Sequence, residues 1–437
     1  MLNLDYRPHY KCCGLYKTKH IEHETTGEVL KCKISELQQV VHEAGNLTPG
    51  DEPKEMQVGK YSYISCCDPS QPEVKIYQLQ ERIGKGANSS VTDAFDISSG
   101  MHYAYKRKLP KTADEVSPPP AKNKSAAAAL KCELPPLETQ TNKELVEMLD
   151  AGGKSSKTTT IVYEGEAENI RLIKQEITAN PELQQLLPAG LKGPYLPVAD
   201  LIHEVKWKDK IDLVLEKGDT SLHRALKFHT KHKMDLDIIW TFATQLLSIL
   251  KLFEKMGLVH ADFKARNAII NFKNRELKLI DFDVLVQLPP DNSSSCNASR
   301  SKAFHTRLYY TQKSYKQLKN ANTNAAVRRA WLYHQRVTFA HTFYELFRLA
   351  PFTNTDEEKQ QLTIAEKQRF TELDITQTVS YKAMPENLKN FLDTLIDEKL
   401  PSLDNLMLDK AAKKGYRKNF TNIYAASPDV GLLVMEA

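Results

Sequence analysis

The sequence predicts an α+β protein of two lobes, in which an antiparallel sheet with one helix precedes a mostly helical part. Short segments of alternating apolar and polar residues, such as 77–83 and 101–106, gather in the first half of the chain. From residue 235 onward, apolar residues recur three and four positions apart, as on one face of a helix. This order, strands first and helices later, is the basis of the prediction.

Composition limits the classes of protein that need to be considered. The chain has 437 residues, 41% of them hydrophobic, and a formal net charge of +5, so a mostly disordered chain is excluded and two or three folding units are expected. The charge is spread along the chain, which makes a nucleic-acid partner unlikely. There is no apolar run of about 18 residues, no apolar core of a signal peptide at the start, and no dense cysteine framework. We therefore expect no membrane span and an intracellular protein, cytoplasmic, nuclear or both.

Shifts in composition divide the chain into four parts. Residues 1–75 form an N-terminal extension, whose cysteine and histidine spacing fits no common zinc site. Residues 76–216 form the sheet lobe, with a flexible insertion at about 107–160 that is rich in proline, alanine, glycine and lysine. Residues 217–400 form the helical lobe, and 401–437 form a C-terminal tail.

Periodicity and breaker residues place the individual elements. The strongest helix signal lies at 235–256, because its apolar residues form one stripe and Gly257 follows it. Residues 287–325 are polar and are expected to form a long loop. The other expected elements are strands at 91–97, 196–205, 211–215, 268–272 and 277–280 and helices at 164–179, 221–228, 328–349, 356–373 and 385–399.

Five features with chemical potential follow one another along the chain. A glycine-rich turn between two strands is followed by a lysine within a strand and then by a helix with acidic residues on its inward face. The segment His260-Ala-Asp-Phe-Lys-Ala-Arg-Asn267 comes after the helix expected at 235–256. A strand then ends in Asp281, 14 residues beyond Asn267. Each feature alone is common, so the information lies in their order and spacing.

Together, the five features resemble the eukaryotic-like protein kinase superfamily. The resemblance covers residues 77 to about 285 by motif and continues to about 400 by helix pattern. Retention of the core residues amid divergence elsewhere resembles the kinases of large DNA viruses. The resemblance implies a serine/threonine protein kinase that uses ATP and Mg²⁺ and acts on protein substrates.

The resemblance implies that the turn and the strand lysine bind the nucleotide phosphates. Backbone N–H groups of Gly84 and Gly86 would approach the phosphates, since glycine leaves no side chain in the way. Ser89 stands where the family has a third glycine, and Val91 follows it. Lys106 would hold the α- and β-phosphates.

Two further groups of residues would complete the nucleotide site. Lys106 needs a carboxylate partner, for which Glu166 is the first choice and Glu168 the alternative. Leu215 would border the adenine pocket, and backbone groups of Glu216, Lys217 and Gly218 would contact the base, since they occupy the position of the family's hinge.

The segment from His260 to Asp281 would hold the catalytic residues. Asp262 would accept or orient the proton of the attacking hydroxyl, and Lys264 would contact the γ-phosphate. Asn267 and Asp281 would ligate Mg²⁺, because amide and carboxylate oxygens suit this ion. His260 would be structural.

Three departures from the family pattern weaken the expectation about the substrate platform more than the one about the ATP site. Ala261 replaces an arginine that normally binds a phosphate on the activation loop, so activity independent of such phosphorylation is expected. Asp283 replaces a glycine and predicts a stiffer segment. Gln335 takes the place of a usual aspartate.

Alternatives remain both for the specificity of a protein kinase and for the function itself. Lys264 favours serine/threonine specificity, whereas Ala265-Arg266 leaves dual specificity open. A small-molecule phosphotransferase with the same fold and a scaffold pseudokinase are the runner-up functions. Serine and threonine residues at 293–306 are candidate autophosphorylation sites, and the lysine-rich segment 410–418 is either a weak nuclear-import signal or a solvated tail. The oligomeric state is left open.

Overall fold

The computed structural model describes the greater part of the chain. The residues described are 10–11, 21–23, 29–30, 34–68, 71–85, 89–109, 162–163, 165–188, 195–229, 232, 234–288, 317, 321, 323–351 and 375–425. Most of the predicted insertion, the candidate autophosphorylation sites and the helix expected at 356–373 lie outside these residues. The described chain forms two compact units, one made of Met1–Ala129 with Asp200–Lys217 and the other of Leu130–Ala199 with Gly218–Ala437.

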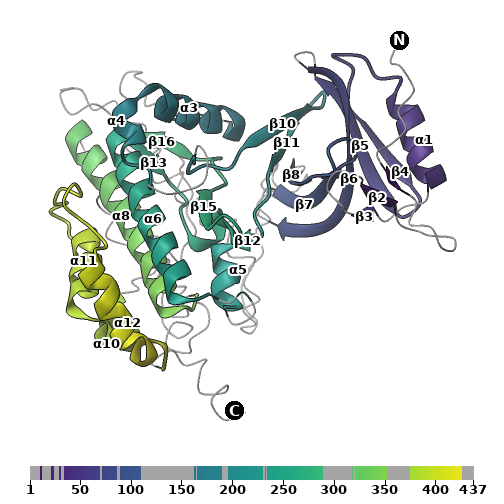
Figure 1. Cartoon of the computed structure of the whole chain (residues 1–437). Helices are drawn as coiled ribbons and strands as arrows, with labels where there is room; N and C mark the ends of the chain where they lie inside the picture. Colours follow the sequence, from purple (N-terminus) through teal and green to yellow (C-terminus); the bar gives the residue numbers. More distant parts are fainter. Residues whose placement is uncertain are drawn as a thin grey trace, which may run out of the picture. The chain divides into compact units, whose positions relative to one another are not determined.

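The first unit is built on a curled antiparallel sheet of seven strands (Figure 1). Their order across the sheet is β10-β11-β8-β7-β6-β5-β4, so the last strands along the chain lie at one edge and the earliest at the other. A small sheet of β1 (Tyr10–Lys11), β2 (Ile21–His23) and β3 (Val29–Leu30) precedes it. The seven strands are β4 (Lys54–Val58), β5 (Tyr61–Asp68), β6 (Gln71–Lys85), β7 (Ser89–Asp96), β8 (His102–Lys108), β10 (Leu201–Lys206) and β11 (Ile211–Glu216).

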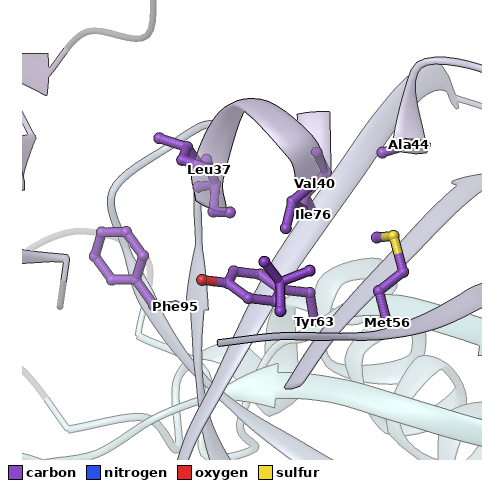
Figure 2. Packing of buried hydrophobic residues seen from close by; sticks show 9 residues of the cluster. Leu37, Val40, Ala44, Met56, Tyr63, Ile76 and Phe95 are labelled. Carbon is purple, nitrogen blue, oxygen red and sulfur yellow. The ribbon is translucent and has the colours of Figure 1, made fainter. Parts of the chain in front are cut away.

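Both faces of this sheet are covered by apolar side chains. On one face, Ile64 of β5 packs with Tyr105 and Val214 from strands across the sheet. On the other face, Tyr63 of β5 meets helix α1 (Ile34–Ala44), whose buried residues include Leu37 and Val40, as Figure 2 shows. Neighbouring residues of a strand point to opposite faces, so β5 is needed for both clusters. The sheet thus continues across residue 75, the predicted limit of the N-terminal extension.

Truncation of Leu37 is expected to destabilise the first unit. Leu37 is 2% exposed, and Leu37→Ala should lower the free energy of unfolding by about 2–5 kcal/mol, because it leaves a cavity between α1 and the sheet. Gln38→Ala on the exposed side of the same helix is the control, and it should change stability by less than about 0.5 kcal/mol. Urea unfolding followed by circular dichroism measures both. Equal effects of the two substitutions would contradict the packing of α1 on the sheet.

The second unit is mostly helical and contains two small sheets, β12-β14-β15 and β13-β16-β9. The combination of this unit with the seven-stranded sheet is the α+β class predicted. Its strands are β9 (Val162–Tyr163), β12 (Thr220–Ser221), β13 (Leu258–His260), β14 (Ala268–Asn271), β15 (Glu276–Leu279) and β16 (Leu285–Gln287). Its helices are α3 (Glu166–Ala179), α4 (Pro181–Gln184), α5 (Leu222–Lys227), α6 (Leu236–Met256), η2 (Ala265–Asn267), α8 (Asn324–Arg348), η5 (Ile375–Gln377), α10 (Val379–Ala383), α11 (Glu386–Ile396) and α12 (Lys410–Ala425).

Helix α6 lies in the core of this unit and corresponds to the helix predicted at 235–256. The Asp235 side chain accepts the N–H of Ile238 at its start, and Gly257 ends it in the left-handed conformation with φ 67°. Among the described residues, α6 is the one helix long and apolar enough to cross a membrane, although 61% of its most apolar stretch is buried inside the protein. Such burial is typical of the core helix of a globular domain.

Helices α8 and α12 complete the core around α6. α8 is buried on nearly all sides and packs against α6 and α11. α12 lies in the segment predicted as a C-terminal tail, and the hydroxyl of its buried Tyr416 donates to the carbonyl of Phe347 at 2.7 Å. Lys413 of α12 forms an ion pair of 2.7 Å with Asp237 of α6. These lysine-rich residues therefore form a packed helix.

Candidate active site

In the first unit, the predicted phosphate-binding residues form one row across the sheet. Gly84 lies opposite Val91, Val91 opposite Lys106, and Lys106 opposite Leu213. Directly opposed residues of antiparallel strands project from the same face, so these four belong to one surface. Lys106 is only 6% exposed. Sequence spacing predicted the residues, and strand register now places them side by side.

The glycine-rich turn is described only at its two ends. A β-carbon on Gly84 would lie 3.4 Å from that of Val91, in ordinary van der Waals contact with the next strand. Ser89 begins β7 opposite Lys108. Gly86 lies outside the described residues, and its predicted contact with phosphate stays a prediction.

The end of β11 holds the residues predicted to contact the base. Leu215 lies opposite Ala104, on the same face as Lys106, because residues two apart along a strand point to one side. The backbone N–H of Glu216 donates to the carbonyl of Asp200 at 2.7 Å, and the Glu216 carboxylate accepts the N–H of Asp200 at 3.0 Å. These two bonds fix the backbone at the end of the strand.

Asp93 ties the residue after Glu216 to strand β7. Lys217 Nζ lies 2.6 Å from one oxygen of Asp93, and His102 Nδ1 lies 3.0 Å from the other. Burial opposes ionisation of Asp93, but the hydrogen bonds from His102 and Lys217 outweigh it and lower its pKa. The carboxylate therefore stays charged at neutral pH and anchors Lys217.

In the second unit, Gly218 occupies a position that only glycine fits. A β-carbon there would lie 2.9 Å from the β-carbon of Ile269 and 3.0 Å from the carbonyl oxygen of Ile270. The next residue, Asp219, donates its N–H to that same carbonyl at 2.9 Å. The predicted hinge glycine is thus required for close approach of the backbone to β14.

The predicted catalytic and metal-binding residues form a connected set between β13 and β16. Lys264 Nζ lies 2.6 Å from the Asp262 carboxylate. Asn267 Nδ2 donates to the Asp262 carbonyl at 2.9 Å and lies 3.2 Å from the Asp281 carboxylate. Four side chains spread over 20 positions of sequence thereby meet in one place. Because its nitrogen makes both of these bonds, the Asn267 amide has a defined orientation.

His260 makes two hydrogen bonds beside Asp262 and Asp281. Its Nε2 faces the carbonyl oxygen of Ile280 at 3.0 Å, so this nitrogen carries the proton and donates. Its backbone N–H donates to Oε1 of Gln335 on α8 at 3.2 Å. Burial lowers the pKa of the imidazole, more than the Ile280 carbonyl raises it, which keeps the ring neutral. These contacts agree with the structural role predicted for His260.

Gln335 shows why an amide can stand where an aspartate was expected. An amide has one oxygen, which accepts the N–H of His260. The N–H of Ala261 instead donates to the carbonyl of Val284 at 3.4 Å. A second side-chain acceptor is therefore not needed. His334 adds a contact of 3.2 Å between its Nε2 and the carbonyl of Ala261, so α8 holds the loop at two successive residues.

Helix α3 holds the segment around Phe282 through two side chains. Glu166 accepts the N–H of Phe282 at 3.2 Å, and Asn169 donates to its carbonyl at 2.7 Å. Glu166 is buried, whereas Glu168 is exposed and lies 3.8 Å from Arg171. The choice of Glu166 as partner of Lys106 stays a prediction. Asn169 was missed, although its position three residues after Glu166 places both on one helix face.

Carboxylates gather at the predicted metal site. Oxygen atoms of Glu166, Asp281 and Asp283 lie within 4.8 Å of one another. Asp281 adopts the left-handed conformation with φ 68°, which is uncommon for residues other than glycine, although asparagine and aspartate adopt it more often than most residues. With the amide of Asn267 beside it, the group offers the hard oxygen donors that Mg²⁺ prefers. The residues present therefore fit this ion.

Comparison with known proteins identifies two relatives, and no protein-family model matches the chain. The chain is 32% identical over 95 residues to the dual specificity protein kinase YAK1 of Saccharomyces cerevisiae. These residues make up 22% of this chain and 10% of the relative. It is 28% identical over 119 residues to the serine/threonine-protein kinase mph1 of Schizosaccharomyces pombe. These residues make up 27% of this chain and 17% of the relative. The similarity thus spans less than a fifth of the length of either relative.

Proposed function

The chain is related to the protein kinase superfamily, and from this premise we propose that it is an intracellular protein kinase that transfers the γ-phosphate of Mg-ATP to serine or threonine hydroxyls of proteins. The observation that carries the proposal is the connected set of Asp262, Lys264, Asn267 and Asp281. A scaffold that only binds partners has no need of this arrangement, because phosphoryl transfer is what requires a base, a cation and two metal ligands together.

In the proposed reaction, Asp262 acts on the acceptor and Lys264 on the group that moves. The acceptor oxygen forms a bond to the γ-phosphorus while the bond from that phosphorus to the β–γ bridging oxygen breaks. The hydroxyl proton passes to Asp262, and ADP leaves. Lys264, held 2.6 Å from Asp262, offers positive charge close to the oxygens on which negative charge develops.

Asn267 and Asp281 would hold Mg²⁺, and Lys106 would hold the α- and β-phosphates. When bound, the ion neutralises phosphate charge and orients the phosphates. The row of Gly84, Val91 and Lys106 supports the nucleotide assignment, because it combines an open backbone, an apolar contact and a cation on one face of a sheet. The carboxylate that Lys106 requires is proposed to be Glu166.

The test compares classes of acceptor. Purified protein is incubated with labelled Mg-ATP and casein, a basic protein, the chain itself or small hydroxyl compounds. We expect label on serine or threonine of protein acceptors, identified after acid hydrolysis. Lys106→Met should reduce labelling by about 10²-fold or more, because the phosphates lose their cation, and it thereby excludes a contaminating kinase. Labelling of small compounds alone would instead establish a small-molecule phosphotransferase. Labelled tyrosine as well would establish dual specificity, which the name of one relative carries.

A further inference from the structure

Exposed cations stand beside the catalytic loop without a role in the reaction proposed above. Arg266 lies in η2, between Lys264 and Asn267, and its side chain is exposed. Helix α5 packs against η2 and exposes Arg224 and Lys227, which are one helical turn apart. We call these three residues, Arg224, Lys227 and Arg266, the basic rim.

The charge of the basic rim is not neutralised within the described part of the chain. None of the three residues forms an ion pair with a described carboxylate, whereas Lys413 and Arg417 of α12 share Asp237. Asp219 is the acidic residue close to α5 in sequence, and one of its oxygens accepts the N–H of Phe272 at 2.8 Å. An uncompensated positive field beside a reaction site attracts ligands of opposite charge.

The surroundings of His223 indicate that Arg266 and Lys227 of the basic rim lie close to one side chain. It lies on α5, four residues before Lys227, and is half-buried. Its burial, followed by the positive charges of Arg266 and Lys227, lowers the pKa of His223 to about 4. The imidazole is therefore neutral at pH 7. Arg266 and Lys227, from two different elements, act on the same side chain.

We propose that the basic rim selects substrates whose acceptor hydroxyl is flanked by acidic residues, either carboxylates or phosphorylated side chains. This inference rests on the proposed protein kinase function. Arg266 follows Asp262 by only four residues and is exposed, so we expect a peptide whose hydroxyl reaches Asp262 to lie near it. Acidic flanking residues gain attraction there, and basic ones meet repulsion, so the rim favours one class and rejects the other.

The test uses matched peptides with one acceptor serine and glutamate, glutamine or lysine at the flanking positions. For the wild-type protein, kcat/KM should be about tenfold or more higher for the glutamate peptide than for the lysine peptide, and this ratio should shrink as salt increases. Arg266→Glu combined with Lys227→Glu should reverse the order of the two peptides. Lys410→Glu, an exposed charge reversal on α12, is the matched control and should keep the wild-type order.

The outcomes separate this inference from the proposed function. Transfer to all three peptides at equal rates, or an unchanged order in the double variant, would overturn the role of the rim while leaving the kinase function intact. Transfer to no peptide and no protein would overturn the kinase function itself. Phosphoserine in place of glutamate tests whether the rim also accepts a phosphate, and its failure would restrict the proposal to carboxylates.

A second measurement does not depend on activity. The pKa of His223, followed by NMR of the imidazole C2 proton, should lie near 4 in the wild-type protein and rise in Arg266→Ala, because removal of a nearby positive charge favours protonation. An unchanged pKa in Arg266→Ala would show that Arg266 does not reach α5 and would contradict the geometry of the rim.

Discussion

Asp262→Asn is expected to lower phosphate transfer by a factor of about 10²–10⁴ while nucleotide binding is retained. Asparagine has nearly the shape of aspartate and still offers an oxygen to Lys264 at the position now 2.6 Å away. It cannot accept the proton of the acceptor hydroxyl. The loss should therefore appear in kcat, measured with labelled ATP at saturating acceptor, and not in the affinity for a fluorescent Mg-nucleotide.

An exposed aspartate elsewhere provides the control for this substitution. Asp209 lies in the turn between β10 and β11, and Asp209→Asn makes the same chemical change on the surface. It should leave kcat and nucleotide affinity at their wild-type values. If Asp262→Asn kept more than a tenth of wild-type kcat, the assignment of Asp262 as the base would fail.

The second large effect is expected from Gln335, which acts through the loop that it holds. Gln335→Leu removes the acceptor of the His260 N–H and leaves this buried donor without a partner, at a cost of about 1–3 kcal/mol in the free energy of unfolding. The loop that carries Asp262 would lose one of its anchors on α8. A shift of about 1 Å at the reacting groups can reduce the rate by about 10²-fold. Urea unfolding and steady-state kinetics measure the two effects.

A positioning role for Gln335 predicts more than lost stability. The KM for ATP should stay near the wild-type value while kcat falls, because the predicted phosphate-binding row of Gly84, Val91 and Lys106 is untouched. Gln335→Glu keeps an oxygen acceptor, and Nε2 of Gln335 has no hydrogen-bond partner among the described residues, so this variant should recover most of the kcat. If Gln335→Glu were as slow as Gln335→Leu, the hydrogen bond to His260 would not be what positions the loop.

Several elements were predictable because their apolar residues recur at one clear period. Helix α6 presents its stripe of Ile239, Phe242, Leu246, Ile249 and Phe253 to the core, and its capping residues mark both ends. Strand β5 was missed because both of its faces are buried, one under α1 and the other in the apolar cluster on the opposite face of the sheet. Its sequence therefore lacks the alternation of apolar and polar residues that identifies a half-buried strand. Helix α12 was missed because its lysines suggested a solvated tail, although Ala412, Tyr416 and Ile423 lie on one face.

In the candidate active site, the order of residues along the sequence predicts which residues belong to it, whereas their burial and contacts depend on packing. The order of Lys106, Asp262, Asn267 and Asp281 along the chain predicted these residues as site residues without any geometry. The sequence offered both Glu166 and Glu168 on one helix, and only the packing of α3 shows which of them is buried. Side-chain to backbone bonds, such as that of Gln335 to His260, leave no mark on periodicity and had to be found in the structure.

The two hydrogen bonds from α3 to Phe282 link the position of this helix to the backbone next to Asp281. Glu166 and Asn169 hold both polar groups of one peptide residue, and Asp281 comes directly before it. A displacement of α3 would break both bonds and leave the N–H and the carbonyl of Phe282 without these partners, directly after Asp281 with its φ of 68°. A ligand that displaced α3 would therefore alter the backbone next to Asp281, a predicted metal ligand, without contacting Asp281 itself.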